Sequence, residues 1–166
     1  MQLIQRCFAG GSLGILLLAG CGDGRPSLVP INGTVTLNGT PVEGAQLGFE
    51  PQEIEGYSRP SMAITDAQGK FTIGTYDKAD GIPAGSYKVS VFKRDVVSKL
   101  PENFNSEDTA SSVVPVTYKW AVPQKYSTTL DSGITVEISS SGMKPDTIAL
   151  TGEAEVQTSG PAANAP

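Results

Sequence analysis

The residue with the most specific chemistry in this sequence is Cys21, which directly follows Leu18, Ala19 and Gly20. This tetrad matches the bacterial lipobox, in which the cysteine thiol accepts a diacylglyceryl group and the chain is then cut on its N-terminal side. Small residues before the cut let the extended chain enter the peptidase, and a thiol is a nucleophile suited to lipid transfer. The tetrad predicts lipidation of Cys21 and signal cleavage between Gly20 and Cys21.

The element that would present this tetrad is an export signal over residues 1–20. Arg6 supplies a positive start, and residues 7–19 are apolar or small. That stretch is shorter than the roughly 20 apolar residues needed to span a bilayer, and it fits a removable signal. An ordinary secretory signal with a chance cysteine, or a buried core strand, are the alternatives. Residues 21–30 are expected to tether the lipid to the fold.

Lipidation would decide where the protein works. Two acyl chains on Cys21 meet the requirement for stable anchoring, so membrane lipid is the expected partner. An Asp directly after the lipidated cysteine retains some lipoproteins at the inner membrane, but here Gly22 holds that position. We therefore expect a cell-envelope lipoprotein carrying palmitate-type acyl chains, with the outer membrane, on its periplasmic or surface face, as the default.

Composition removes most catalytic chemistry. The chain has no His, Cys7 would leave with the signal, and Cys21 would be consumed by the lipid. The commonest general base and metal ligands are thereby lost, so no metal site, cofactor or enzymatic activity is expected. A hydrolase using carboxylates alone stays open, although no pair stands out. With 17 Asp and Glu against 12 Lys and Arg, the balance argues against nucleic acid or anionic lipid as a partner.

Two groups of side chains could instead bind a ligand. Tyr118 and Trp120, with Tyr126, could form an aromatic platform for a carbohydrate or peptide on a long, polar loop predicted over 94–122; the alternative is that Trp120 is a hydrophobic plug. A second group of acidic residues could suggest a calcium loop, but they lack the regular spacing of one, and turn capping is the preferred interpretation: Asp66, Asp77 and Asp80.

The rest of the chain alternates in the manner of β-strands. Seven short runs are predicted, separated by turn signals such as Asn38-Gly39, and no helical period is found: 31–37, 45–50, 61–65, 70–75, 86–93, 134–139 and 146–151. Within 86–93, Tyr87, Val89 and Val91 share one face. This pattern predicts an all-β, antiparallel seven-stranded β-sandwich over 31–152. The Ala/Pro/Ser-rich tail, 153–166, is expected to be disordered.

Five segments in order carry a family resemblance: Gly33–Ala45, Phe49–Pro51, Thr65–Phe71, Asp80–Val89 and Val122–Tyr126. They are similar to the G-x-V-T hairpin, F-x-P, T-D-x-x-G-x-F, D-G-x-x-x-G-x-Y-x-V and V-P-x-K-Y segments of carboxypeptidase regulatory-like, transthyretin-like domains, found as small lipoproteins in planctomycete-type bacteria. The resemblance implies a Greek-key sandwich of the prealbumin type. The expected function is a non-catalytic domain with a structural or binding role, its partner an envelope protein or glycan.

Overall fold

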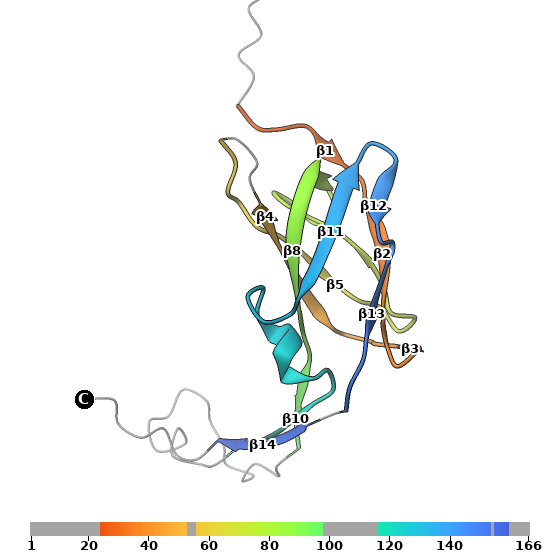
Figure 1. Ribbon diagram of the computed structural model, residues 1–166, viewed down its shortest axis with the longest axis vertical. Coiled ribbons are helices and arrows are strands. Elements are labelled where there is room, and N and C mark those ends of the chain that lie inside the picture. The colour runs from red at the N-terminus through yellow and green to blue at the C-terminus, as the bar shows by residue number, and fades with distance from the viewer. Residues whose placement is uncertain (1–23, 53–55, 98–115, 154, 160–166) are drawn as a thin grey trace, which may run out of the picture.

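The computed structural model describes residues 24–52, 56–97, 116–153 and 155–159, and within them the chain is all-β (Figure 1). The described residues also include a short 3₁₀ helix, η2 (Gln124–Ser127). The strands among the described residues are β1 (Leu28–Val29), β2 (Asn32–Leu37), β3 (Thr40–Pro41), β4 (Gln46–Gln52), β5 (Ser61–Ile64), β6 (Lys70–Thr72), β7 (Ile82–Pro83), β8 (Gly85–Phe92), β9 (Arg94–Val96), β10 (Val116–Trp120), β11 (Ile134–Ser139), β12 (Gly142–Lys144), β13 (Thr147–Leu150) and β14 (Glu155–Ser159).

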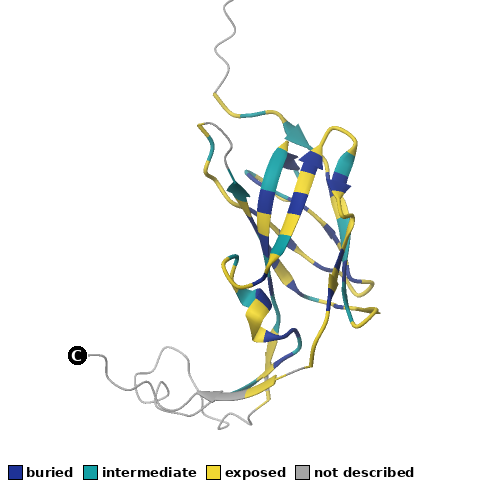
Figure 2. Ribbon diagram, in the orientation of Figure 1, coloured by how far each residue is buried: buried dark blue, intermediate teal, exposed yellow. Residues whose placement is uncertain are grey.

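All seven runs predicted from alternation are strands, namely β2, β4, β5, β6, β8, β11 and β13. The clearest run, β8, buries Tyr87, Val89 and Val91 and exposes Lys88. Figure 2 shows buried and exposed positions along the strands of the fold. Successive side chains of a strand point to opposite faces, so an apolar residue at every second position produces one buried face. The sequence pattern therefore predicted both the strands and the side of each that faces inward.

Two main sheets enclose the core. One has the order β12-β11-β8-β4-β5, and the other has the order β13-β2-β3 with β6 also paired to β2. The sheets meet at one edge, where Met62 and Gly74 exchange two backbone hydrogen bonds of 2.9 Å. The expectation of a wholly antiparallel fold was wrong, because β13 runs parallel to β2. After β12 the chain crosses to the other sheet and enters it beside β2 in the same direction.

The buried side chains come from both sheets. Phe49 of β4 and Tyr87 of β8 are fully buried, and they share one cluster with Val35 and Phe71 from the opposite sheet. The Phe49 and Phe71 rings lie 6.0 Å apart in a tilted arrangement. Burying side chains of this size contributes about 1.5–3 kcal/mol each, so this cluster is the main source of stability. Phe71, Tyr87 and Tyr126 are all buried in this core.

Turn residues behave as their chemistry requires. Asn38 and Gly39 have positive φ angles of 50° and 83°, which gives the two-residue turn that joins β2 to β3. The Asn38 side chain also bonds the backbone of Gly152 just beyond β13, donating through Nδ2 at 2.8 Å and accepting through Oδ1 at 3.3 Å. The predicted turn therefore also joins the end of β2 to the end of β13.

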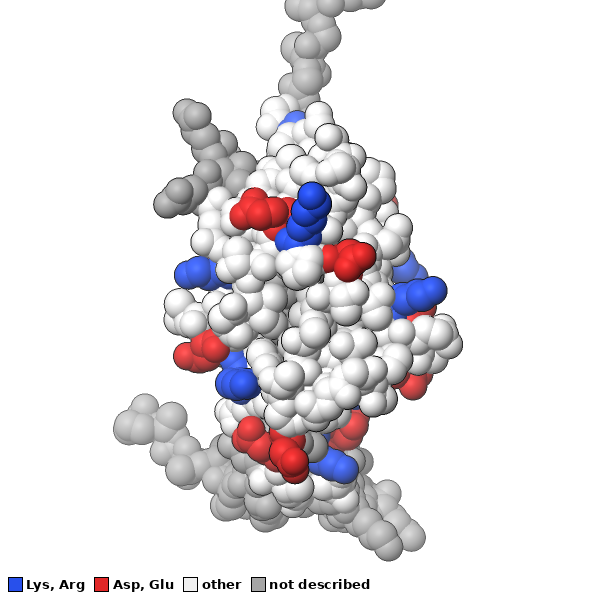
Figure 3. Space-filling view, turned by 45° about the vertical axis from the view of Figure 1, so that its right-hand side comes forward, with Lys and Arg blue, Asp and Glu red and all other residues white. Residues whose placement is uncertain are grey.

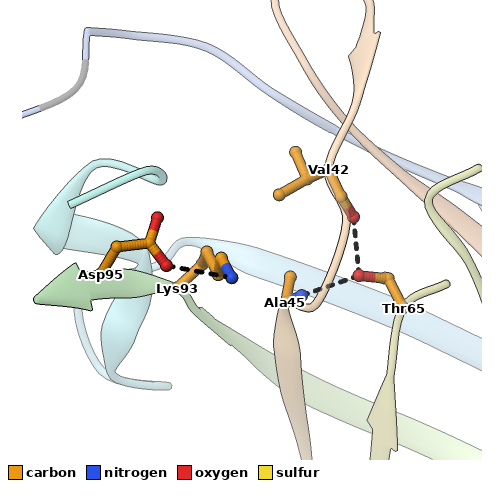
Figure 4. Close-up of polar contacts among 5 residues, drawn as sticks. All are labelled: Val42, Ala45, Thr65, Lys93 and Asp95. Carbon is orange, nitrogen blue, oxygen red and sulfur yellow. Dashed lines mark hydrogen bonds and ion pairs between the residues drawn. The ribbon is translucent and has the colours of Figure 1, made fainter. Parts of the chain in front are cut away.

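A buried hydroxyl closes the corner that leads into β4 (Figure 4). Thr65 is 4% exposed, and its Oγ1 donates to the Val42 carbonyl at 2.6 Å and accepts from the Ala45 amide at 2.8 Å. These backbone groups lie outside the regular ladder and away from water, so each needs a partner. One threonine supplies both partners.

The structure differs from the sequence prediction in three polar segments. Within the predicted 94–122 loop, β9 and β10 are strands that join β14 in a separate antiparallel sheet. β14 itself lies in the tail expected to be disordered, and β1, in the predicted tether, pairs with β7. Pairing partners distant in the sequence stabilise these strands, so local alternation did not reveal them. Residues 1–23, 98–115 and 160–166 lie outside the described residues.

Candidate functional site

The aromatic residues proposed as a binding platform lie on β10. Tyr118 and Trp120 are two positions apart, so they share one face of the strand. Trp120 is only 5% exposed and packs edge-to-face against Phe92, with ring centroids 5.4 Å apart. Such contact geometry is typical of a buried aromatic pair. In this arrangement Trp120 fills the role of a plug and offers little ring surface to a ligand.

An arginine covers the same group of rings. The guanidinium carbon of Arg94 lies 4.2 Å from the centroid of Tyr118, 5.3 Å from Phe92 and 5.9 Å from Trp120. A guanidinium over an aromatic face is attracted by the quadrupole of the ring. Arg94 therefore occupies one face of the Tyr118 ring, on which a sugar or peptide side chain could otherwise stack.

The third aromatic residue, Tyr126, lies on η2 and is buried. Its hydroxyl donates to the Thr151 carbonyl at 3.1 Å and accepts from the Thr151 amide at 3.2 Å. Burial acts to raise the pKa of Tyr126, but the bonds to Thr151 and the nearby Lys125 ammonium outweigh it and lower that pKa. The phenol thus joins η2 to the end of β13, which is a structural role.

Two of the three acidic residues, Asp66 and Asp80, act as turn caps, as predicted. Asp66 Oδ1 accepts from the amides of Gln68 and Lys70, both at 2.9 Å. The Asp80 carboxylate accepts from the amides of Thr75, Tyr76 and Asp77, at 2.7, 3.1 and 2.9 Å. Within the described ranges, no three His, Cys, Asp or Glu side chains are grouped so that they could hold a metal ion.

The stability that Asp80 gives to its loop is expected to depend on pH. Its amide bonds, led by that from Thr75, hold the pKa of Asp80 below its ordinary value. Ionised Asp80 thus stabilises the fold above the unfolded-state pKa, and this contribution is lost as the pH falls through the lower folded-state pKa. In thermal melts from about pH 7 to about pH 2, Asp80→Asn should have a lower melting temperature than the native protein at neutral pH. The difference in melting temperature should shrink as the pH falls.

The exposed Glu43→Gln variant serves as the control for this experiment, and it should follow the native curve. The difference in melting temperature between Asp80→Asn and the native protein could also be the same at every pH. That result would show that the carboxylate charge has no part in holding the loop.

A broad hollow in the surface lies away from these residues, on the outer faces of β2, β5 and β6. Its lining combines apolar and charged side chains, among them Met62, Ile64, Lys70 and Asp146. Met62 and Ile64, on the outward face of β5, are 62% and 66% exposed. The hollow is open and carries charges of both signs, so its chemistry suits weak contact with an extended surface better than enclosure of a small molecule.

Arg59 and Tyr76, which line this hollow, form with Arg25 a cluster that no sequence pattern indicated. The guanidinium carbons of Arg25 and Arg59 lie 4.7 Å and 5.0 Å from the centroid of the Tyr76 ring. Arg59 also donates from Nε to the Thr75 carbonyl at 3.0 Å. The three residues are distant in the sequence and match no motif, so only the fold could bring them together.

The lipidation and cleavage positions, Cys21 and Gly20, lie outside the described residues. Among the residues that are described, no helix is long and apolar enough to cross a membrane. Comparison of the chain with protein families, curated proteins and solved structures gave no match.

Proposed function

We propose that this protein is a lipid-anchored cell-envelope lipoprotein whose β domain is not an enzyme and has a structural or binding role. The observation that carries the proposal is the tetrad Leu18–Cys21, followed after a short polar segment by β1, the first strand of the folded domain. An anchor of this kind would hold the whole domain at a membrane through a tether of only a few residues. The outer membrane remains the default location.

The family resemblance supports the same proposal. Its five segments span most of the described domain and supply strands of both main sheets. We infer that the seven strands predicted from the sequence form a sandwich of the carboxypeptidase regulatory-like kind. The additional strands, including those of the sheet β14-β10-β9, would then be additions to it.

The roles of the titratable groups favour a scaffold over a catalyst. Perturbed pKa values mark candidate catalytic residues, but they also arise in structural networks. Burial raises the pKa of Tyr87, and its hydroxyl donates to the Pro83 carbonyl at 2.9 Å. Asp80 is engaged by three backbone amides. Each of these groups has a partner in the backbone that accounts for its position.

The arrangement of the domain fits display from a membrane. β1 lies at one end of the long axis, and the sheet that contains β10 and β14 lies at the other (Figure 1). A lipid on Cys21 would therefore place the β1 end near the bilayer. The sheet with β10 and β14, where Arg94 covers Tyr118, would face away from the membrane toward an envelope partner.

Lipidation is tested by labelling cells with radioactive palmitate. The native chain should incorporate label and lose its first twenty residues, whereas Cys21→Ser should remain an unlabelled, uncut precursor, because its hydroxyl is a weaker nucleophile than a thiol. Cys7→Ser is the matched control and should be labelled and cut normally. Labelling or normal maturation of the Cys21→Ser protein would refute the proposal.

A further inference from the structure

The dipeptide Asn-Gly occurs twice in the chain, in nearly identical surroundings in the sequence. Residues 31–34 read Ile-Asn-Gly-Thr, and residues 37–40 read Leu-Asn-Gly-Thr. Asparagine is among the thermolabile residues of proteins, and a glycine after it has no Cβ to hinder the approach of its backbone nitrogen to the side-chain amide. The two pairs have the same chemistry, so a difference in their reactivity must come from the fold.

The reaction open to both pairs is deamidation. The backbone nitrogen of the glycine gives up its proton to the solvent and forms a bond to Cγ of the asparagine, while the bond from Cγ to Nδ2 breaks and Nδ2 leaves as ammonia. Water then opens the resulting succinimide at either carbonyl, which leaves aspartate or isoaspartate. The reaction needs water and no oxidant, and the side chain and the following peptide must rotate toward each other.

The fold blocks this rotation at Asn32. Asn32 and Gly33 lie within β2, which pairs with β6. A Cβ on Gly33 would lie 2.4 Å from Cζ of Phe71 and 2.7 Å from Cε of Met143, and both of these side chains are buried. Turning this peptide would separate two strands and displace core side chains, so it requires an opening close to global unfolding.

Asn38 and Gly39 are held by fewer contacts. Both are exposed in the two-residue turn between β2 and β3, and a Cβ on Gly39 would meet no atom within 4 Å. Nδ2 of Asn38 donates to the Gly152 carbonyl at 2.8 Å, and Oδ1 accepts from the Gly152 amide at 3.3 Å. Because Nδ2 is the leaving group, its bond must break before ammonia departs. An exposed turn can open at a fraction of the global free energy of unfolding.

We propose that Asn38 is the deamidation site of the folded protein and that its bonds to Gly152 set the rate. Asn32, with matching neighbours in the sequence, is protected by its place in β2. The proposal rests on the turn and its contacts, and it is independent of the lipidation of Cys21.

The product releases the turn from the end of β13. In aspartate an oxygen takes the place of Nδ2, so two acceptors face each other where Asn38 now donates to the Gly152 carbonyl. Isoaspartate also places an extra carbon in the main chain of a turn that has only two residues. Because Gly152 lies between β13 and β14, the reaction loosens the connection to the sheet β14-β10-β9 as well.

The test compares the two asparagines within one protein. Purified full-length protein is incubated at mildly alkaline pH, either folded or in concentrated guanidinium chloride, and is then digested with pepsin in acid. Tandem mass spectrometry follows the conversion of each amide to an acid. In guanidinium chloride the two should react at similar rates, because their neighbours match. In the folded protein Asn38 should react more slowly than in guanidinium chloride. It should also react at least about ten-fold faster than Asn32, which corresponds to about 1.4 kcal/mol in the free energy of opening.

Equal rates at Asn32 and Asn38 in the folded protein, or no reaction at Asn38, would overturn the proposal. A rate at Asn38 that is the same in folded and unfolded protein would refute the restraint by Gly152. Gly39→Ala is measured in guanidinium chloride, where folding has no influence. Its methyl group should slow the reaction at Asn38 and leave that at Asn32 unchanged.

A mimic of the product tests the consequence. In urea denaturation, Asn38→Asp should raise the unfolding equilibrium constant by about two- to ten-fold, because the bond from Nδ2 to Gly152 is lost. Asn32→Asp is the matched control with the same change of charge. It should have little effect, because Asn32 Oδ1 accepts from the Thr72 hydroxyl at 2.7 Å and a carboxylate can do the same.

Equal effects of the two substitutions would reject the release of the turn. If Asn38→Asp does not fold, as judged by circular dichroism, the deamidated native protein replaces it. That product is separated from the unreacted chain by its additional negative charge, and its urea denaturation is compared with that of the unreacted chain.

Discussion

Replacing Gly69 with alanine is expected to lower the free energy of unfolding by about 2–5 kcal/mol, a large part of the roughly 5–15 kcal/mol of a typical domain. Gly69 has a φ angle of +71°, which costs an L-residue about 1–2 kcal/mol. A Cβ there would also lie 2.6 Å from the Val35 carbonyl oxygen and 3.1 Å from Pro41 Cβ. Forcing atoms into such a space adds about 1–3 kcal/mol.

The Val35 carbonyl has little freedom to move away. It accepts a hydrogen bond of 3.1 Å from the Val42 amide, and the Val35 amide donates to the Gly69 carbonyl at 2.8 Å. Any shift that relieves the clash therefore disturbs the junction between β2, β3 and the turn before β6.

Gly39→Ala is the matched control, and urea denaturation is the measurement. Gly39 also has a positive φ, +83°, but a Cβ there would meet no atom within 4 Å. It should show the conformational cost of about 1–2 kcal/mol without the clash. Equal losses in the two variants would mean that the strands around Gly69 move apart without cost.

Thr65→Val is expected to destabilise the domain by about 2–6 kcal/mol. The substitution keeps the shape of the side chain but removes the hydroxyl, which leaves the Val42 carbonyl and the Ala45 amide without their partner. Each buried group left unsatisfied costs about 1–3 kcal/mol. Urea denaturation, compared with the native protein, gives the change in free energy.

Two variants identify the cause of this loss. Thr65→Ser keeps the hydroxyl and should retain most of the stability. Thr72→Val removes a hydroxyl that is exposed and donates to the exposed Asn32 side chain, so a change within about 0.5 kcal/mol is expected. If Thr65→Val proved as stable as Thr65→Ser, the two backbone groups would have to find other partners, and the assigned role of the hydroxyl would be wrong.

The sequence predicted those parts of the fold that depend on neighbouring residues. Alternation along β8 and β11 identified these strands and their buried faces, because side-chain direction in a strand repeats every two residues. Turn chemistry was equally local. Asn38-Gly39 formed the predicted turn, and Asp66 and Asp80 cap turns through bonds to backbone amides.

What the sequence did not predict depends on contacts between distant segments. β1 and β7 are two-residue strands, too short for any pattern to show, and they exist because they pair with each other. The parallel pairing of β13 with β2 follows from where the chain crosses between sheets. The environment of Trp120 likewise depends on Phe92 and Arg94, which come from another part of the chain. No local pattern carries such information.

The pairing of β2 with β13 also constrains the order of folding. Thr34 pairs with Thr147, so β2 finds this neighbour only after the intervening strands β3 to β12 have been synthesised. Folds dominated by such distant contacts form slowly, because a long loop must close before the contact stabilises it. The completed core must therefore wait for β13. For a protein that we propose is exported, this delay would keep the chain unfolded, and so fit to be threaded across a membrane, until β13 has been made.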